Sequence, residues 1–279
     1  MILQAVSGAT AAELANLKAQ AEGAGAAGLA DSAAEAAAGQ VELARAGQSA
    51  KDVMASLPAV LATATAGEMD VAEAAGFVTQ VLAAFNLAAD QSGRVADVLA
   101  KGADDSKTSI RGIGEALSYV GPAALAFGYS LEETVSYIEA LATKGIDASR
   151  AGTGLASIMS QIADPSTKAA GALEDAGIES KKLGEVLTAL AKGGPMAEAA
   201  ILAFGLEAGP ALRSLIATGT AGIAELQASL RESGGYADQA AAAITNNFLG
   251  ALKPLGGAIK DVRNRIGEGL LGPLEYSGP

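Results

Sequence analysis

The sequence of 279 residues has no cysteine, no histidine and no tryptophan, and only 4% of it is aromatic. Without Cys and His, the chain cannot build a zinc cluster, an iron–sulfur site, a disulfide or a thiol nucleophile. Every catalytic dyad or triad that relies on an imidazole is excluded for the same reason. We therefore assign no catalytic, cofactor-binding or metal-binding residue from the sequence, and we expect no cofactor.

Basic residues are also few, since 19 Lys and Arg stand against 31 Asp and Glu, for a net charge of -12. Nucleic-acid-binding proteins carry a basic stripe, so we expect no sequence-specific binding to nucleic acid. The acidic residues dominate up to Gly93, whereas Lys253, Lys260, Arg263 and Arg265 make the C-terminal region locally basic. This polarity is compatible with head-to-tail or oligomeric contact, and equally with a solvated charged face.

Long hydrophobic runs are missing, although the mean hydropathy is +0.31. The longest charge-free runs are Val53–Gly67, Ala74–Ala89 and Ala116–Leu131. Each is shorter than the roughly 20 apolar residues of a membrane-spanning helix and contains Gly or Pro. The positive mean comes from alanine, which supplies about a quarter of the chain. We expect a soluble protein without a signal peptide, made in the cytoplasm.

Capping patterns predict short helices throughout. Ser49 with Asp52 and Ser130 with Glu133 are typical helix starts, and Asp164–Pro165 is typical of one helix ending and the next beginning. Polar–apolar alternation and Asn-Gly or Asp-Gly hairpin turns are absent, so no strand is predicted. The expected fold class is all-α, with many short Ala/Gly-rich helices packed as hairpins, self-associating, and no sheet.

The helix after Ser130 shows the clearest apolar stripe, which consists of Leu131, Val135, Ile138, Leu141 and Ala142. This spacing predicts one buried face, with Glu132, Glu133 and Glu139 lying off it. Gly145 is expected to end the helix in the left-handed conformation.

One short pattern occurs three times, at Leu82–Leu87, Leu125–Tyr129 and Leu202–Leu206. Each copy places a Phe before an Asn or Gly that tolerates positive φ, which predicts a helix end anchored by one aromatic side chain. The spacing between the copies is irregular, so we do not predict a solenoid repeat.

Patterns that suggest chemistry are weak. Gly152-Thr153-Gly154 lacks the Lys-Ser/Thr of a phosphate loop and fits a helix start better. Glu179-Ser180 is a poor general-acid candidate, because two lysines follow and no apolar cleft is indicated. The acidic pairs Asp104-Asp105 and Glu132-Glu133 are expected at helix starts, where the macrodipole explains them. No active site emerges.

The order and spacing of many short stretches resemble the core region of phage tail tape measure proteins. The similar segments are Ala46–Ala50, Leu57–Leu61, Ala72–Ala75, Ala84–Leu87, Val95–Ala100, Glu115–Leu117, Val120–Ala124, Tyr129–Thr134, Lys144–Ile146, Ser149–Thr153 and Ala203–Gly205, with Asn247–Pro273 as a more variable continuation. Members of this family are usually much longer, so the chain resembles a fragment. The resemblance divides it into a helical lead-in (1–31), a core-like domain (32–218) and a variable C-terminal segment (219–279).

What the resemblance implies is a non-enzymatic structural protein of the virion tail. It would act in tail-tube nucleation and tail-length determination inside the tube or tip, and leave the tube ahead of DNA. The implied partners are tail-tube and tail-tip proteins, tail assembly chaperones and further copies of itself, as a trimer or hexamer. Two alternatives remain: a membrane-active helical segment that inserts into the host envelope at ejection, motivated by runs such as Ala74–Ala89, and a cell-wall hydrolase.

Overall fold

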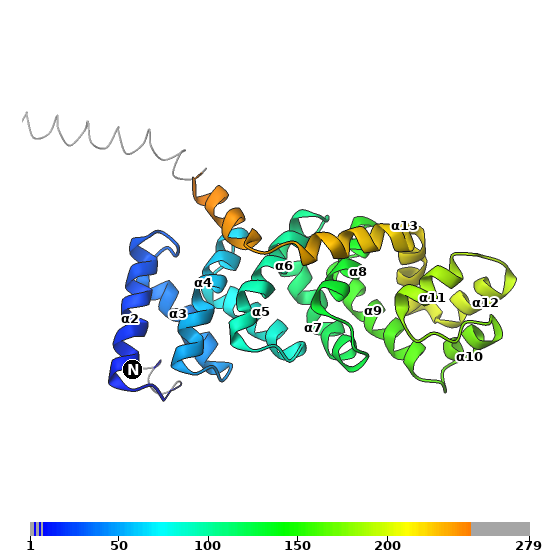
Figure 1. Ribbon diagram of the computed structural model, residues 1–279, viewed down its shortest axis with the longest axis horizontal. Helices are drawn as coiled ribbons and strands as arrows, with labels where there is room; N and C mark the ends of the chain where they lie inside the picture. The colour runs from blue at the N-terminus through cyan, green and yellow to red at the C-terminus, as the bar shows by residue number, and fades with distance from the viewer. Residues whose placement is uncertain (1–2, 4–5, 7, 247–279) are drawn as a thin grey trace, which may run out of the picture.

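The computed structural model describes residues 3, 6 and 8–246, and every regular element in this part is helical. Figure 1 shows an elongated stack in which most helices lie across the long axis. The predicted all-α class is confirmed. The expected C-terminal continuation Asn247–Pro273 and the basic residues from Lys253 to Arg265 lie outside the described residues.

The helices follow one another with short connections. They are α2 (Ala11–Ala26), α3 (Ala33–Arg45), α4 (Ala50–Ala66), α5 (Val71–Ala84), the 3-10 turn η1 (Ala89–Gln91), α6 (Ser92–Asp104), α7 (Ile110–Ala126), α8 (Leu131–Thr143), α9 (Ala148–Ala163), α10 (Lys168–Asp175), α11 (Leu183–Leu190), α12 (Pro195–Ala203) and α13 (Gly205–Arg231). Residues 236–246 are also helical.

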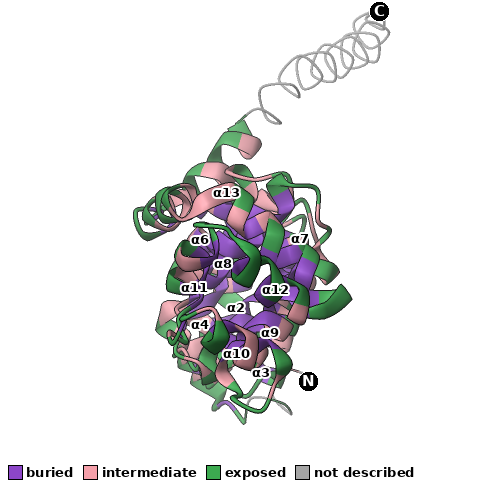
Figure 2. Cartoon of the chain, turned by 90° about the vertical axis from the view of Figure 1, so that its right-hand side faces the viewer, coloured by how far each residue is buried: buried purple, intermediate pink, exposed green. Residues whose placement is uncertain are grey.

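The stack has two rows of helices. One row consists of α3, α5, α7 and α9, each packed on the next, and the other runs from α4 through α6 and α8 to α13. Successive helices from α3 to α9 alternate between the two rows. Figure 2 shows the buried residues gathered between the rows and the exposed ones around them.

The predicted helix starts are present. Ser49 accepts from the Asp52 amide, and Ser130 forms a full capping box with Glu133. At the end of α8, Gly145 has φ +82°, and the Ile146 amide donates to the Leu141 carbonyl in a Schellman motif.

The three predicted aromatic helix ends are confirmed. Phe85, Phe127 and Phe204 are the residues directly after α5, α7 and α12. The residue that follows each Phe has positive φ: +52° at Asn86, +73° at Gly128 and +75° at Gly205. Phe85 and Phe204 are buried, and Phe127 packs against the core while partly exposed.

Two helix boundaries differ from the prediction. Asp164 ends α9 as expected, but Pro165 does not begin the next helix, because Ser166 and Thr167 bond back to Asp164 and only Thr167 caps α10. Gly152-Thr153-Gly154 lies inside α9 rather than at its start. A Cβ on Gly152 would lie 2.5 Å from the Ala116 carbonyl oxygen, so glycine allows α9 to approach α7.

The chain reverses direction at its C-terminal end. Gly219, with φ 80° and ψ 152°, interrupts α13, so its two halves run in different directions. The first half lies among α9, α11 and α12, and the second runs back over α8 and α6 (Figure 1). We call residues 220–246 the strap, because this segment returns along the stack toward the N-terminal helices.

Candidate interaction surfaces

The weak chemical candidates do not converge on a site. Glu179 is exposed in the loop between α10 and α11, and not in the buried apolar cleft that a general acid needs. Gly152 faces α7, and Gly154 faces Ala211 of α13, so both serve helix packing. Among residues 3, 6 and 8–246, no group of three or more Asp and Glu side chains is placed to hold a metal ion.

Glu132 begins α8 as predicted, but it is buried and not on a solvated face. Arg94 of α6 donates two bonds to its carboxylate, at 2.6 and 2.8 Å. Burial raises the pKa of this carboxyl, and the Arg94 bonds and charge outweigh that effect, so the pKa lies below its usual value. The pair joins α6 to α8.

Asp104-Asp105 corrects the sequence prediction, because the pair lies at the end of α6 and not at a helix start. The macrodipole disfavours carboxylates there. Lys101 compensates through an ion pair with Asp105 at 2.5 Å, and the strap supplies further donors.

A polar clasp fastens the strap to α6. Both Asp97 carboxylate oxygens accept backbone amides, from Gly235 at 2.8 Å and Ala237 at 2.9 Å, so Asp97 caps the helical residues 236–246 from another element. Tyr236 donates to Asp104 and Ser229 donates to Asp105. The Asp104 bond raises the pKa of Tyr236 to about 12. The clasp therefore joins groups more than 120 residues apart in sequence.

Glu139 lies behind the clasp and is buried, although the sequence places it off the predicted buried face of α8. The residue is 0% exposed, and neither carboxylate oxygen has a hydrogen-bond partner. A Cβ on Gly102 of α6 would lie 2.7 Å from its Oε1. Burial raises the pKa of Glu139 to about 8; the Asp105 charge adds to this effect and the Lys101 charge opposes it.

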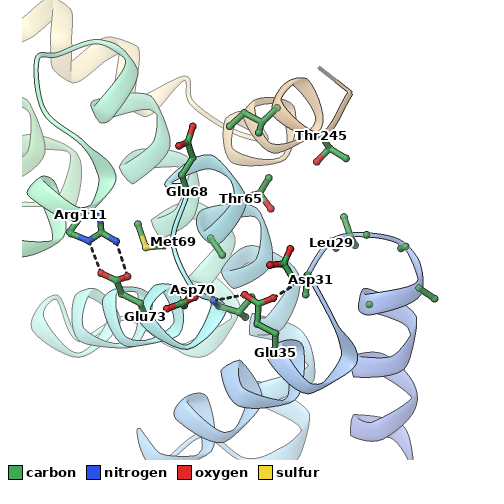
Figure 3. A pocket seen from close by; sticks show the side chains of 18 residues that line it. Leu29, Asp31, Glu35, Thr65, Glu68, Met69, Asp70, Glu73, Arg111 and Thr245 are labelled. Carbon is green, nitrogen blue, oxygen red and sulfur yellow. Dashed lines mark hydrogen bonds and ion pairs between the residues drawn. The ribbon is translucent and has the colours of Figure 1, made fainter. Parts of the chain in front are cut away.

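A groove opens at the N-terminal end of the stack, with a cavity volume of about 860 Å³ (Figure 3). The α2–α3 and α4–α5 loops form its walls, with Arg111 of α7 and Thr245 of the strap. Glu73 and Arg111 form a bidentate ion pair at 2.6 and 2.8 Å. Glu35 accepts the backbone amides of Asp31 and Val71, which joins the two loops.

A smaller apolar cleft of about 300 Å³ continues this groove between α4 and the strap. Leu29, Thr65 and Thr245 line both hollows, so the two form one continuous surface. We call the combined surface the N-terminal groove.

The opposite end of the stack exposes apolar side chains. Met196 and Leu202 of α12 are 52% and 66% exposed, and Leu206 at the start of α13 is 98% exposed. Leu206 occupies the last position of the third Phe pattern. At the same position in the other two copies, Leu87 and Tyr129 pack into the core. At this end, the same local pattern leaves its apolar residue uncovered.

Sequence reasoning missed the clasp and the groove. Asp97, Arg111 and Tyr236 carry no local pattern, because their partners come from distant parts of the chain. Glu68 could have been noticed in the sequence. It is a carboxylate at the positive-φ position after a helix, where the described part of this chain otherwise has Gly or Asn.

The described helices differ from membrane-spanning helices when they are considered one at a time. No single helix there is long and apolar enough to cross a bilayer. One bent pair, Val71–Ala84 with Ala89–Asp104, passes by length and composition together, at an angle of 119°. In the stack, Val78 of the first helix and Val95 and Leu99 of the second are fully buried.

Comparison with known proteins gives consistent matches. A family model described as phage-related minor tail protein matches residues 18–198. The tape measure protein of Pneumococcus phage Dp-1 is 33% identical over 275 residues, which cover 93% of this chain and 24% of the relative. The probable tape measure protein of Escherichia phage P2 is 34% identical over 179 residues, covering 63% and 22%. The chain thus spans about a quarter of these relatives' length. No solved structure matches it.

Proposed function

Since the chain belongs to the family of phage-related minor tail proteins, we propose that it is a segment of a tape measure protein acting in tail-length determination and tail-tube nucleation. The match to two tape measure proteins carries this proposal, because one of them aligns with 93% of the chain. The role is structural and non-enzymatic, within the tail tube or tip of the virion, after synthesis in the host cytoplasm.

The proposed partners are tail-tube and tail-tip proteins, tail assembly chaperones and further copies of this chain. The net charge of -12 supports contact with proteins rather than with nucleic acid. The uncovered apolar end around Leu206 supports self-association, and the trimeric or hexameric order is proposed from the symmetry of a tail tube.

The packing is compatible with passage through a tube. Neighbouring helices meet through Gly and Ala, as at Gly152 with Ala116 and Gly121 with Ala84. The sequence has no cysteine, so no disulfide holds the layers together. Such a chain can be compact at one stage and extended at another.

An in-frame deletion of residues 32–218 from the parent phage protein tests the proposal through tail length in negative-stain electron microscopy. If this segment lies extended as a helix in the tail, tails shorten by about 280 Å, from roughly 1.5 Å per residue. If it keeps the stack, where helices lie across the long axis, the shortening is much smaller. Absence of tails assigns the segment to nucleation. Normal tails contradict both roles.

A length-preserving variant separates length from fold. Gly152→Leu forces α9 away from Ala116 of α7 without changing the number of residues. A segment that measures length only as an extended chain gives normal tails with this variant. A segment that nucleates the tube through its folded stack gives few tails or none. Gly76→Leu, in open space on α5, is the matched control.

Membrane insertion is the second candidate, favoured by the bent pair of helices between Val71 and Asp104. Insertion requires these helices to leave the core. The full chain mixed with dye-filled liposomes at neutral pH tests this: the structural role predicts no leakage, and leakage supports the membrane role.

A peptidoglycan zymogram tests hydrolase activity, and we expect no clearing.

A further inference from the structure

We propose that the N-terminal groove is a docking site for the basic segment of the same chain, residues 251–266. This surface goes beyond the proposed role in the tail and does not depend on it. The argument rests on the composition of the groove, on where the described chain ends, and on charge.

The groove is apolar at one end and acidic at the other. Leu29 lies where the two hollows join, and it is 49% exposed although it follows the helix-ending Gly28 of α2. Equivalent residues after other helix ends, such as Tyr129 and Ile178, are buried. The Leu29 side chain is therefore much more exposed than the side chains at the equivalent positions after these other helices.

The acidic end carries more charge than its own cations balance. Five carboxylates line it, from Asp31, Glu35, Glu68, Asp70 and Glu73, against the single cation Arg111. Arg111 forms its ion pair with Glu73. Asp31, Glu68 and Asp70 form no ion pair with any residue that the structure describes.

Glu68 is placed there against local preference. It has φ +48° directly beyond the C-terminal end of α4, where glycine is favoured by conformation and a cation by the macrodipole. Its backbone is fixed by the Met69 amide, which donates to the Ala64 carbonyl. A cationic partner in the groove would offset the unfavourable interaction of the Glu68 carboxylate with the macrodipole of α4.

The described chain ends beside the groove. Thr245 lines both hollows and Asn246, the last described residue, lines the apolar one. Lys253 is seven positions beyond Asn246, a reach of up to about 25 Å. This length of chain is enough to bring Lys253 back to the groove that Thr245 lines.

The following sequence complements both ends of the groove. Residues 251–266 contain Lys253, Lys260, Arg263 and Arg265 against the single acid Asp261. Leu252, Leu255, Ile259, Val262 and Ile266 are spaced three and four residues apart, a pattern typical of one apolar helix face. Apolar residues suit Leu29 and the α4 side, and the basic residues suit Glu68 and Asp70.

Carbodiimide cross-linking of the full chain tests the proposal, because this reagent joins a lysine to a carboxylate only when the two are in contact. We expect peptides that link Lys253 or Lys260 to Asp31, Glu68 or Asp70, within monomers. Glu174 and Asp175, exposed on α10 at the other end of the stack, are the control acids and stay unlinked. In about 0.5 M NaCl, where the Debye length is only about 4 Å, the yield falls.

Charge reversal provides the variants. Glu68→Lys with Asp70→Lys reduces the cross-link yield and speeds tryptic cleavage at Lys260, each by about tenfold. Lys253 precedes Pro254, and trypsin does not cleave a Lys-Pro bond. Glu174→Lys with Asp175→Lys leaves both unchanged. Lys253→Glu with Lys260→Glu removes the lysines that can be cross-linked, so the readout for this variant is tryptic cleavage at Arg263 in low salt. We expect this cleavage to become faster. The variant changes none of the residues that the structure describes.

Three results overturn the proposal. One is the absence of cross-links from Lys253 and Lys260 to the groove. The second is equal linkage to Glu174 and Asp175, which means random collision. The third appears when equal amounts of light and heavy isotope-labelled chains are mixed: if about half of the links join a light to a heavy chain, as random pairing requires, a second copy occupies the groove.

Discussion

Gly152 shows how single small residues set the spacing of the stack. A Cβ at this position would lie 2.5 Å from the carbonyl oxygen and 2.9 Å from the Cα of Ala116. Both atoms belong to the backbone of α7, so no change of side-chain rotamer can relieve the clash. A side chain at Gly152 would instead push α9 and α7 apart.

We therefore expect Gly152→Ala to destabilise the protein by about 1–3 kcal/mol, although alanine favours an isolated helix. Gly76→Ala on α5 is the matched control, since nothing lies within 4 Å of its Cβ position. This variant should gain up to about 1 kcal/mol. Urea unfolding midpoints measure both, and equal effects of the two substitutions would contradict the packing argument.

Glu139 makes stability depend on pH in a range where few groups titrate. The chain has no histidine, and burial raises the pKa of Glu139 from 4.5 to about 8. Between these values the unfolded chain has lost this proton and the folded chain keeps it. The stabilising contribution is thus complete below pH 4.5 and is lost progressively as the pH rises to about 8.

Glu139→Gln should remove this dependence, because the amide is neutral at every pH. We expect the variant to be more stable than the parent at pH 9, by up to several kcal/mol, with a flatter profile from pH 5 to 8. Chemical denaturation across this range measures it. A variant with the parent's slope would show that other groups cause the pH dependence.

Among the elements, the helix ends were the part that the sequence predicted best. The cap at Ser49, the capping box at Ser130 and the stop at Gly145 depend on residues within one turn. The Phe anchors were found for the same reason. Pro165 was placed wrongly, because the Asp164 side chain and carbonyl hold Ser166 and Thr167 in a turn that delays the next helix.

Predictions that depended on neighbours failed. The stripe on α8 implied one buried face, but α6, α7, α9 and α13 all pack against this helix, so Glu132 and Glu139 are enclosed as well. Asp104-Asp105 required the strap to explain it, and Tyr236 is 132 residues away from Asp104. No short pattern contains that information.

The strap depends on one capping residue from another element, which gives a test at this scale. Asp97→Ala removes both acceptors of the Gly235 and Ala237 amides, and loss of such a cap costs about 1–2 kcal/mol. Hydrogen exchange of residues 236–246 should speed up by about tenfold or more, while α7 is unaffected. Asp90→Ala, exposed in η1, is the control. Unchanged exchange in the strap would contradict the capping role.

For the whole molecule, the proposed self-association through the uncovered apolar end can be tested. Leu202→Ser with Leu206→Ser should weaken self-association by tenfold or more, since burial of one Leu contributes about 1.5–3 kcal/mol. Sedimentation velocity over a concentration series measures it. Leu125→Ser, at a leucine on α7 that is 44% exposed, should change little. Equal effects at both places would locate the contact elsewhere.

The return of the strap determines how the folded chain responds to force. A pull on the C-terminal side acts first on residues 236–246, whose bonds to Asp97 and Asp104 then break one after another instead of together. Beyond the clasp, helices pack mainly on their nearest neighbours, so each layer can detach without unfolding the rest. Traction from this end would therefore unravel the stack stepwise at low force, whereas compression along the stack would meet all of its layers at once.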